Sequence, residues 1–123
     1  MVVLQGDVFW IELREPRGSE PGYRHPYVIM QNDVFNSSRI NTTIGIALTS
    51  NLSRAYIPGN VLLQKGEANL PKASVANVTQ MVTVDKSDLR EKIGHLSAKR
   101  IREILDGMKL VTEPRDLPFP SPV

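Results

Sequence analysis

The apolar residues of this chain come in short runs of β-forming residues, and stretches containing Gly or Pro separate the runs. Runs of this length and composition, bounded by turn residues, are typical of strands. The predicted strands are Val2–Leu13 with a bend or bulge at Gly6-Asp7, Tyr27–Met30, Ile40–Leu48, Val61–Leu63, Ser74–Val84 and Glu91–Leu96. About six or seven short strands favour a mainly β fold, a small and strongly curved antiparallel barrel.

One helix is predicted, and it follows the last strand. Ser97 is a good N-cap, and the apolar residues after it recur with helical spacing. These residues are Ile101, Ile104, Leu105, Met108 and Val111. We expect the face of Ile101, Ile104, Leu105 and Met108 to pack on the barrel.

The chain of 123 residues is long enough for one domain with its own core. We expect a single domain over residues 1–113, followed by a Pro-rich and flexible tail over residues 114–123. Cysteine is absent, which excludes disulfides, a thiol nucleophile and a zinc–thiolate site, and which fits a reducing cytoplasm. The N-terminus does not have the pattern of a signal peptide, and no window approaches the roughly 20 apolar residues of a membrane span. The predicted location is therefore the cytoplasm, without a membrane partner.

The net charge of +2 permits a nucleic-acid partner but does not require one. Any site for a polyanion must therefore be local and built by folding.

Polar side chains with phosphate-binding chemistry gather at the ends of two predicted strands. Glu20, Arg24 and His25 lie in a Gly/Pro-rich loop over residues 14–26, directly before the second strand. Loop side chains of this kind are presented to something outside the fold. The next strand ends in a cluster of small hydrogen-bonding groups, Thr49-Ser50-Asn51. Cations beside hydroxyl groups suggest a site for a phosphate.

Nine short segments, in a specific order and spacing over about residues 5–112, carry a resemblance to a known family. They are Gly6–Trp10, Gly18–Glu20, Pro26–Asp33, Leu48–Asn51, Pro58–Val61, Ser74-Val75, Thr79-Gln80, Val82–Lys86 and Ile93–Ser97. Together they resemble the MazF/PemK family of toxin endoribonucleases from bacterial type II toxin–antitoxin systems.

The resemblance implies a fold, an activity and partners. The fold is an SH3-like antiparallel barrel of the CcdB/PemK type with a C-terminal helix, and the protein is a homodimer neutralised by a cognate antitoxin. The activity is sequence-specific cleavage of single-stranded RNA without a metal or another cofactor. The RNA 2′-OH attacks the adjacent phosphate and leaves 2′,3′-cyclic phosphate and 5′-OH ends. Two alternatives stay open, a non-catalytic CcdB-like toxin that inhibits DNA gyrase and an RNA-binding module without activity.

The sequence departs from the family pattern at two places. The family has an arginine immediately before the proline that opens the second strand, whereas here His25 takes that position and Arg24 comes one residue earlier. A PemK-like subset also uses an Arg and an Asp before Gln80, and here these positions are Asn77 and Thr79. That version of the mechanism is not expected.

Three residues are predicted to be catalytic. His25 is the one side chain of its loop that titrates close to neutral pH, which suits a general acid or base. Arg24 would clamp a phosphate, Thr49 would donate to a non-bridging oxygen with help from Ser50, and Glu20 would orient the cation or share the base role. The alternatives are structural: a histidine bonded to backbone, an Arg24–Glu20 surface pair, and hydroxyl groups that only end a strand.

Substrate binding is predicted for polar and aromatic loop residues, since single-stranded RNA is bound by rings that stack on bases and cations that follow the backbone. The candidates are Arg17, Glu20, Ser50, Asn51, Arg54 and Tyr56. Solvated loop side chains are the alternative. We expect Trp10 in the core and a structural role for His95. No metal site is expected, because two isolated histidines lack a ligand pattern.

Overall fold

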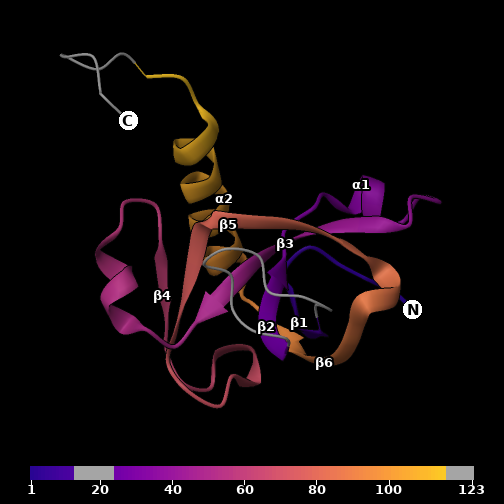
Figure 1. Ribbon diagram of the computed structural model, residues 1–123, viewed down its shortest axis with the longest axis horizontal. Helices are drawn as coiled ribbons and strands as arrows, with labels where there is room; N and C mark the ends of the chain where they lie inside the picture. The colour runs from indigo at the N-terminus through magenta and orange to yellow at the C-terminus, as the bar shows by residue number, and fades with distance from the viewer. Residues whose placement is uncertain (13–23, 116–123) are drawn as a thin grey trace.

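Six strands form one antiparallel sheet in the computed structural model, which describes residues 1–12 and 24–115 (Figure 1). The strands are β1 (Asp7–Glu12), β2 (Arg24–Ile29), β3 (Thr42–Thr49), β4 (Val61–Leu63), β5 (Ser74–Asp85) and β6 (Leu89–His95), in the order β4-β5-β3-β2-β1-β6. The sheet curls into a half-barrel beside a C-terminal helix, so the predicted fold class is confirmed.

Two α-helices lie at different ends of the sheet. The long helix α2 (Ala98–Thr112) packs on β4 and β5, and the single turn α1 (Asp33–Asn36) lies beside β3 (Figure 1). Three short 3₁₀ helices occur in the connections, η1 (Leu52–Tyr56), η2 (Glu67–Asn69) and η3 (Lys86–Asp88). The described residues carry these five helical segments between and after the strands.

The predicted face of α2 is confirmed for most of its length. The Ser97 hydroxyl accepts a hydrogen bond from the Arg100 amide (3.3 Å) and so caps the helix. Ile104 is fully buried, and Ile101, Leu105 and Met108 pack against the same core. Val111, the last apolar residue of the helical pattern, is 41 % exposed. It lies in the last turn of the helix.

Apolar side chains are buried on both faces of the sheet. Val8 of β1 and Val28 of β2 belong to the core under α2, whereas their neighbours Phe9 and Tyr27 belong to a second core on the other face. This division follows from the alternation of side chains along a strand. The curled sheet therefore needs apolar residues at consecutive positions in its central strands.

A long bulge bends β5 sharply (Figure 1). Between the pairs Ile46↔Met81 and Leu48↔Ala76, two steps along β3 face five steps along β5. Asn60 satisfies part of the freed backbone, since its side chain accepts from the Val78 amide (2.9 Å). Such a bulge increases curvature, and on its N-terminal side β5 pairs with both β3 and β4.

The connection between β4 and β5 packs against the opposite edge of the sheet. The Asn69 side chain donates to the Ile93 carbonyl of β6 (3.0 Å). Gly94 of β6 leaves no room for a Cβ, which would overlap the backbone of Ala68. The two edges of the sheet are thus joined through η2 and not by direct strand pairing.

Asp7 is a fully buried carboxylate at the start of β1. Its Oδ1 lies 2.8 Å from His95 Nδ1 and 3.0 Å from Lys92 Nζ, and its Oδ2 accepts from the Leu4 amide (2.9 Å). These contacts tie the N-terminal turn to β6. They are consistent with the structural role expected of His95.

Two predicted strand starts are wrong by three residues or more. The first strand begins at Asp7 and not at Val2, because Gly6 turns the chain with a φ of +96°. The second strand begins at Arg24, three residues inside the predicted loop, because β1 is long enough to pair with this segment. The prediction that Arg24 and His25 lie in a loop is therefore wrong.

Candidate active site

The strands β2 and β3 separate at one end, and this separation creates the site. Their pairing reaches Tyr27↔Ala47 and stops. Among the described residues, β2 pairs only with β1 before Tyr27, and β3 pairs only with β5 beyond Ala47. Pro26 has no N–H to donate, so it cannot complete a ladder with β3. The start of β2 and the end of β3 are left as two walls of an opening.

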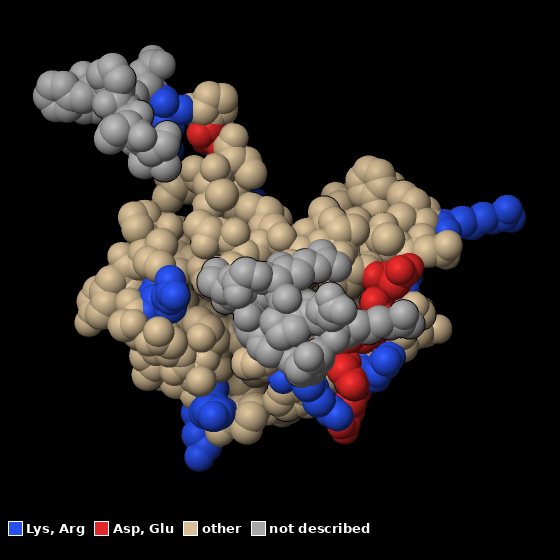
Figure 2. Space-filling view, viewed as in Figure 1, with Lys and Arg blue, Asp and Glu red and all other residues tan. Residues whose placement is uncertain are grey.

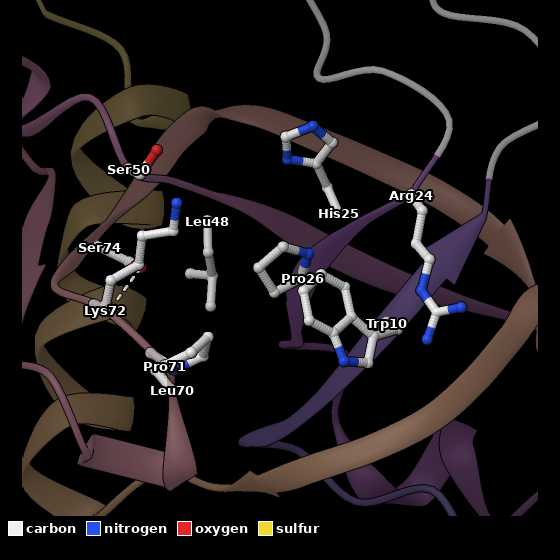
Figure 3. Close-up of a pocket in the computed structure, with 10 residues that line it drawn as sticks. All are labelled: Trp10, Arg24, His25, Pro26, Leu48, Ser50, Leu70, Pro71, Lys72 and Ser74. Atoms are coloured by element: carbon white, nitrogen blue, oxygen red, sulfur yellow. Dashed lines mark hydrogen bonds between the residues drawn. The ribbon is translucent and has the colours of Figure 1, made fainter.

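A pocket of about 220 Å³ occupies this opening (Figure 3). It is lined by Trp10, Arg24, His25, Pro26, Leu48, Ser50, Leu70, Pro71, Lys72 and Ser74. Its apolar lining comes from Trp10, Pro26, Leu48, Leu70 and Pro71. Its polar lining consists of two cations, a histidine and two serine hydroxyl groups. Apolar walls with a few polar groups are the usual composition of a ligand site.

Arg24 forms one end of the pocket. Its guanidinium carbon lies 5.3 Å from the centre of the Trp10 ring, and its Nη2 lies 4.0 Å from Glu91 Oε2. In Figure 3 the side chain runs along the indole and away from His25. Both partners of the ion pair are more than half exposed, so this pair contributes little to stability. The cation–π contact is the main restraint on the guanidinium.

His25 stands on the rim between the two ends of the pocket (Figure 3). Partial burial removes water from the ring and lowers the pKa of His25 below its usual value of 6.5. The imidazole is therefore mainly neutral at pH 7. A neutral imidazole accepts a proton, which favours the base role over the acid role for this residue.

The hydroxyl cluster at the end of β3 is divided between the pocket and a turn. Ser50 lines the pocket, whereas Thr49 does not. Thr49 Oγ1 accepts from the Asn51 amide (3.1 Å), and Asn51 Oδ1 accepts from the amide (3.2 Å) and the hydroxyl (2.7 Å) of Ser53. Asn51 is thereby the N-cap of η1. Thr49 keeps its own O–H as a donor, because a hydroxyl accepts and donates at once.

The remaining predicted residues lie apart from the pocket or outside the described residues. Arg54 and Tyr56 belong to η1 and do not line the pocket, and Tyr56 is 90 % exposed. Arg17 and Glu20 lie outside the described residues, as does the tail beyond residue 115. Of the predicted residues, the fold thus brings Arg24, His25 and Ser50 together.

Three polar or aromatic residues of the pocket, Trp10, Lys72 and Ser74, were not predicted as site residues. Trp10 is only partly buried and lines the pocket, so its predicted place in the core is wrong. Its cross-strand partner is Pro26, so a correct prediction of the register between β1 and β2 would have placed Trp10 beside the site. Lys72 lies in the connection before β5, where the sequence carries no signal that separates it from any exposed turn lysine.

The charge of the surface is mixed. On the face seen in Figure 2, Lys and Arg side chains lie in separate small groups, with acidic side chains near some of them. Residues 1–12 and 24–115 contain no group of three or more His, Asp or Glu side chains arranged to hold a metal ion. None of the helices in that part of the chain has the length and apolar character to cross a membrane.

The family model of PemK-like, MazF-like toxins of type II toxin–antitoxin systems matches residues 4–112. The endoribonuclease MazF6 of Mycobacterium tuberculosis is 38 % identical over 113 residues, which cover 92 % of this chain and 99 % of that relative.

Solved structures show the same fold. The structure of MazF from Deinococcus radiodurans has a TM-score of 0.73 at 20 % identity, covering 90 % of this chain and 96 % of that one. An endoribonuclease in complex with its cognate antitoxin, from a mycobacterial species, has a TM-score of 0.71 at 20 % identity, covering 92 % and 98 %.

Proposed function

This chain belongs to the PemK-like, MazF-like toxins of type II toxin–antitoxin systems, and we propose that it is a metal-independent endoribonuclease that cuts single-stranded RNA at a short sequence motif. The observation that carries the proposal is the pocket at the open ends of β2 and β3. There a histidine with a lowered pKa shares one rim with two cations and a hydroxyl group. These groups suit phosphodiester chemistry without a metal.

The proposed reaction is an in-line transesterification. His25 takes the proton of the RNA 2′-hydroxyl, and the 2′-oxygen forms a bond to phosphorus as the bond from phosphorus to the 5′-oxygen breaks. The departing 5′-oxygen takes a proton from water. The products are a 2′,3′-cyclic phosphate and a 5′-OH end. A positioned general base of this kind contributes roughly 10²–10⁴-fold in rate.

The other predicted residues hold the RNA. Arg24 binds a phosphate beside the Trp10 ring, on which a base can stack. Thr49 donates its O–H to a phosphate oxygen, and Ser50 adds a hydroxyl from the same wall of the pocket. Further substrate contacts are assigned to the remaining predicted residues, Arg17, Glu20, Asn51, Arg54 and Tyr56.

The proposed partners follow from the family. We expect a homodimer in the cytoplasm and a cognate antitoxin that neutralises it, as the mycobacterial relative is described in complex with its cognate antitoxin. The apolar lining of the pocket and the exposed ring of Tyr56 are surfaces that such an antitoxin segment can cover.

The test is cleavage of a long RNA by the purified protein in EDTA, followed by sequencing and chemical analysis of the ends. We expect cuts at one short motif in single-stranded regions, with 2′,3′-cyclic phosphate and 5′-OH ends. A protein that leaves RNA intact in EDTA and blocks DNA gyrase would instead be the non-catalytic toxin of this fold. Cleavage that requires Mg²⁺ would contradict the metal-independent mechanism.

A further inference from the structure

The two cations of the pocket lie at opposite ends of it (Figure 3). Arg24 lies at the Trp10 end, and Lys72 lies at the end formed by Ser50 and Ser74. His25 stands between them on the rim. A phosphate held within reach of His25 can therefore be approached by a cation from either end.

Arg24 is already held at its own end. Its guanidinium stacks on Trp10 and faces Glu91, and both contacts draw it away from His25 (Figure 3). Consecutive residues of a strand also point to opposite sides, so Arg24 and His25 do not aim at the same point. Arg24 is better placed to bind the nucleotide next to the cut than the phosphate that is cut.

Lys72 is directed toward the other wall. In Figure 3 its side chain extends from the edge of the pocket toward Ser50, on the same side of the pocket as the rim that carries His25. Within residues 1–12 and 24–115, the structure gives Lys72 no carboxylate partner. Its ammonium is a charge that the described part of the fold does not itself neutralise.

The backbone that carries Lys72 is fixed on both sides. The Ser74 hydroxyl donates to the Lys72 carbonyl (3.0 Å), and the preceding Pro71 has a restricted φ. Leu70 is 2 % exposed and ties the segment to the core. The lysine therefore extends from a positioned segment toward the pocket, although its side chain is exposed.

We infer that Lys72 is a catalytic residue of the proposed endoribonuclease, an inference that rests on the function proposed above. Its ammonium binds the non-bridging oxygens of the phosphate that is cut and compensates the negative charge that grows there. Lys72 takes no part in the proton transfers of the reaction, which stay as described above. Arg24 and Trp10 hold the neighbouring nucleotide. Loss of one such charge-stabilising group typically costs about 10²–10³-fold in rate.

The experiment separates chemistry from binding with two substitutions and a matched control. Lys72→Met removes the charge and keeps a long side chain, Lys72→Arg restores a charge, and Lys65→Met changes an exposed lysine of the same connection that does not line the pocket. The measurements are the single-turnover cleavage rate at saturating protein and the Kd for the same RNA with a 2′-deoxy sugar at the mapped cut.

Lys72→Met is expected to slow cleavage by roughly 100-fold or more, with a Kd within about 3-fold of the wild type. We expect Lys72→Arg to recover most of the rate and Lys65→Met to match the wild type, all three with unchanged thermal unfolding. Wild-type cleavage with an equally fast Lys72→Met variant would overturn the inference. A weaker Kd with an unchanged rate would do so too, since Lys72 would then only bind the strand. If the wild-type protein cuts no RNA, the result would contradict the proposed function itself.

Discussion

His25 shows how a single residue position decides the chemistry of this site. It takes the position before Pro26 that the family resemblance assigns to an arginine, and at this position β2 pairs with β1 and not with β3. The opening beside β3 gives the ring access to a substrate, and partial burial favours its neutral form. In the proposed mechanism a base thus stands where the family resemblance expects a cation, and the two cations of the pocket lie at the two ends on either side of it.

The pH dependence of cleavage follows from the lowered pKa of His25. The base works when neutral, so kcat/KM should fall as the pH drops, with an acid inflection below 6.5. His25→Gln should lower kcat/KM by about 10²–10⁴-fold and remove this inflection. The measurement is kcat/KM from pH 4.5 to 8 for both proteins. An inflection that persists in His25→Gln would assign it to another group.

Thr49 can be tested by separating its two hydrogen bonds. Thr49→Val removes both the acceptor for the Asn51 amide and the proposed donor to RNA, whereas Thr49→Ser keeps both. We expect Thr49→Val to lose about 10²-fold or more in cleavage rate and Thr49→Ser to stay within about 10-fold of the wild type. The lost bond to Asn51 is exposed and should cost no more than about 1 kcal/mol in unfolding free energy. Equal rates for the two variants would exclude a catalytic hydroxyl.

At the level of elements, the packing of α2 depends on a close contact between two glycines. A Cβ on Gly107 would overlap the carbonyl oxygen of Gly59, in the turn before β4. In an open helix, Gly→Ala stabilises by about 1 kcal/mol, but here the added methyl pushes α2 off the sheet. We expect Gly107→Ala to lower the free energy of unfolding by about 1–3 kcal/mol in urea titrations.

The control for this substitution is its neighbour. Asp106→Ala changes an exposed residue of the same helix turn, and it should shift the free energy of unfolding by less than about 0.5 kcal/mol. If Gly107→Ala proves as stable as Asp106→Ala, the helix can move away from Gly59 without loss.

The elements that local patterns specify were predictable from the sequence, and those set by pairing were not. Ser97 and the apolar spacing after it define α2, and the short β-branched runs define β3, β4 and β5 within one or two residues. The start of β2 at Arg24 depends on pairing with β1, which no local pattern shows. The candidate site has the same limit. The strand-end clusters indicated His25 and Ser50, whereas Lys72 lies at the pocket because the start of β5 pairs with the end of β3 (Thr49↔Val75), which is a tertiary effect.

For the whole molecule, the mixed surface charge predicts weak dependence on salt. A net charge of +2, with Lys and Arg in separate small groups on the face seen in Figure 2, gives little long-range attraction, so we expect only phosphates at the site to be neutralised. Each phosphate contributes about −0.7 to the slope of log K against log salt for a single strand. With two or three phosphates we expect a slope of roughly −1.4 to −2.1, measured with the 2′-deoxy RNA from 50 to 300 mM KCl.

The substitution Arg54→Ala tests this estimate of the number of phosphates that the protein contacts. If Arg54 on η1 contacts one phosphate, its loss should make the slope shallower by about 0.7. A wild-type slope steeper than about −5 would mean that RNA runs over an extended basic surface and not only across the pocket.

The contact between Arg24 and Trp10 has a consequence for observing this protein. The chain has a single tryptophan, and that tryptophan lines the pocket. Indole emission therefore comes from the site and from nowhere else in the chain, and its intensity and wavelength respond to whatever displaces water or the guanidinium from the ring. The molecule carries its own optical reporter, which makes occupancy by RNA or antitoxin visible without a label.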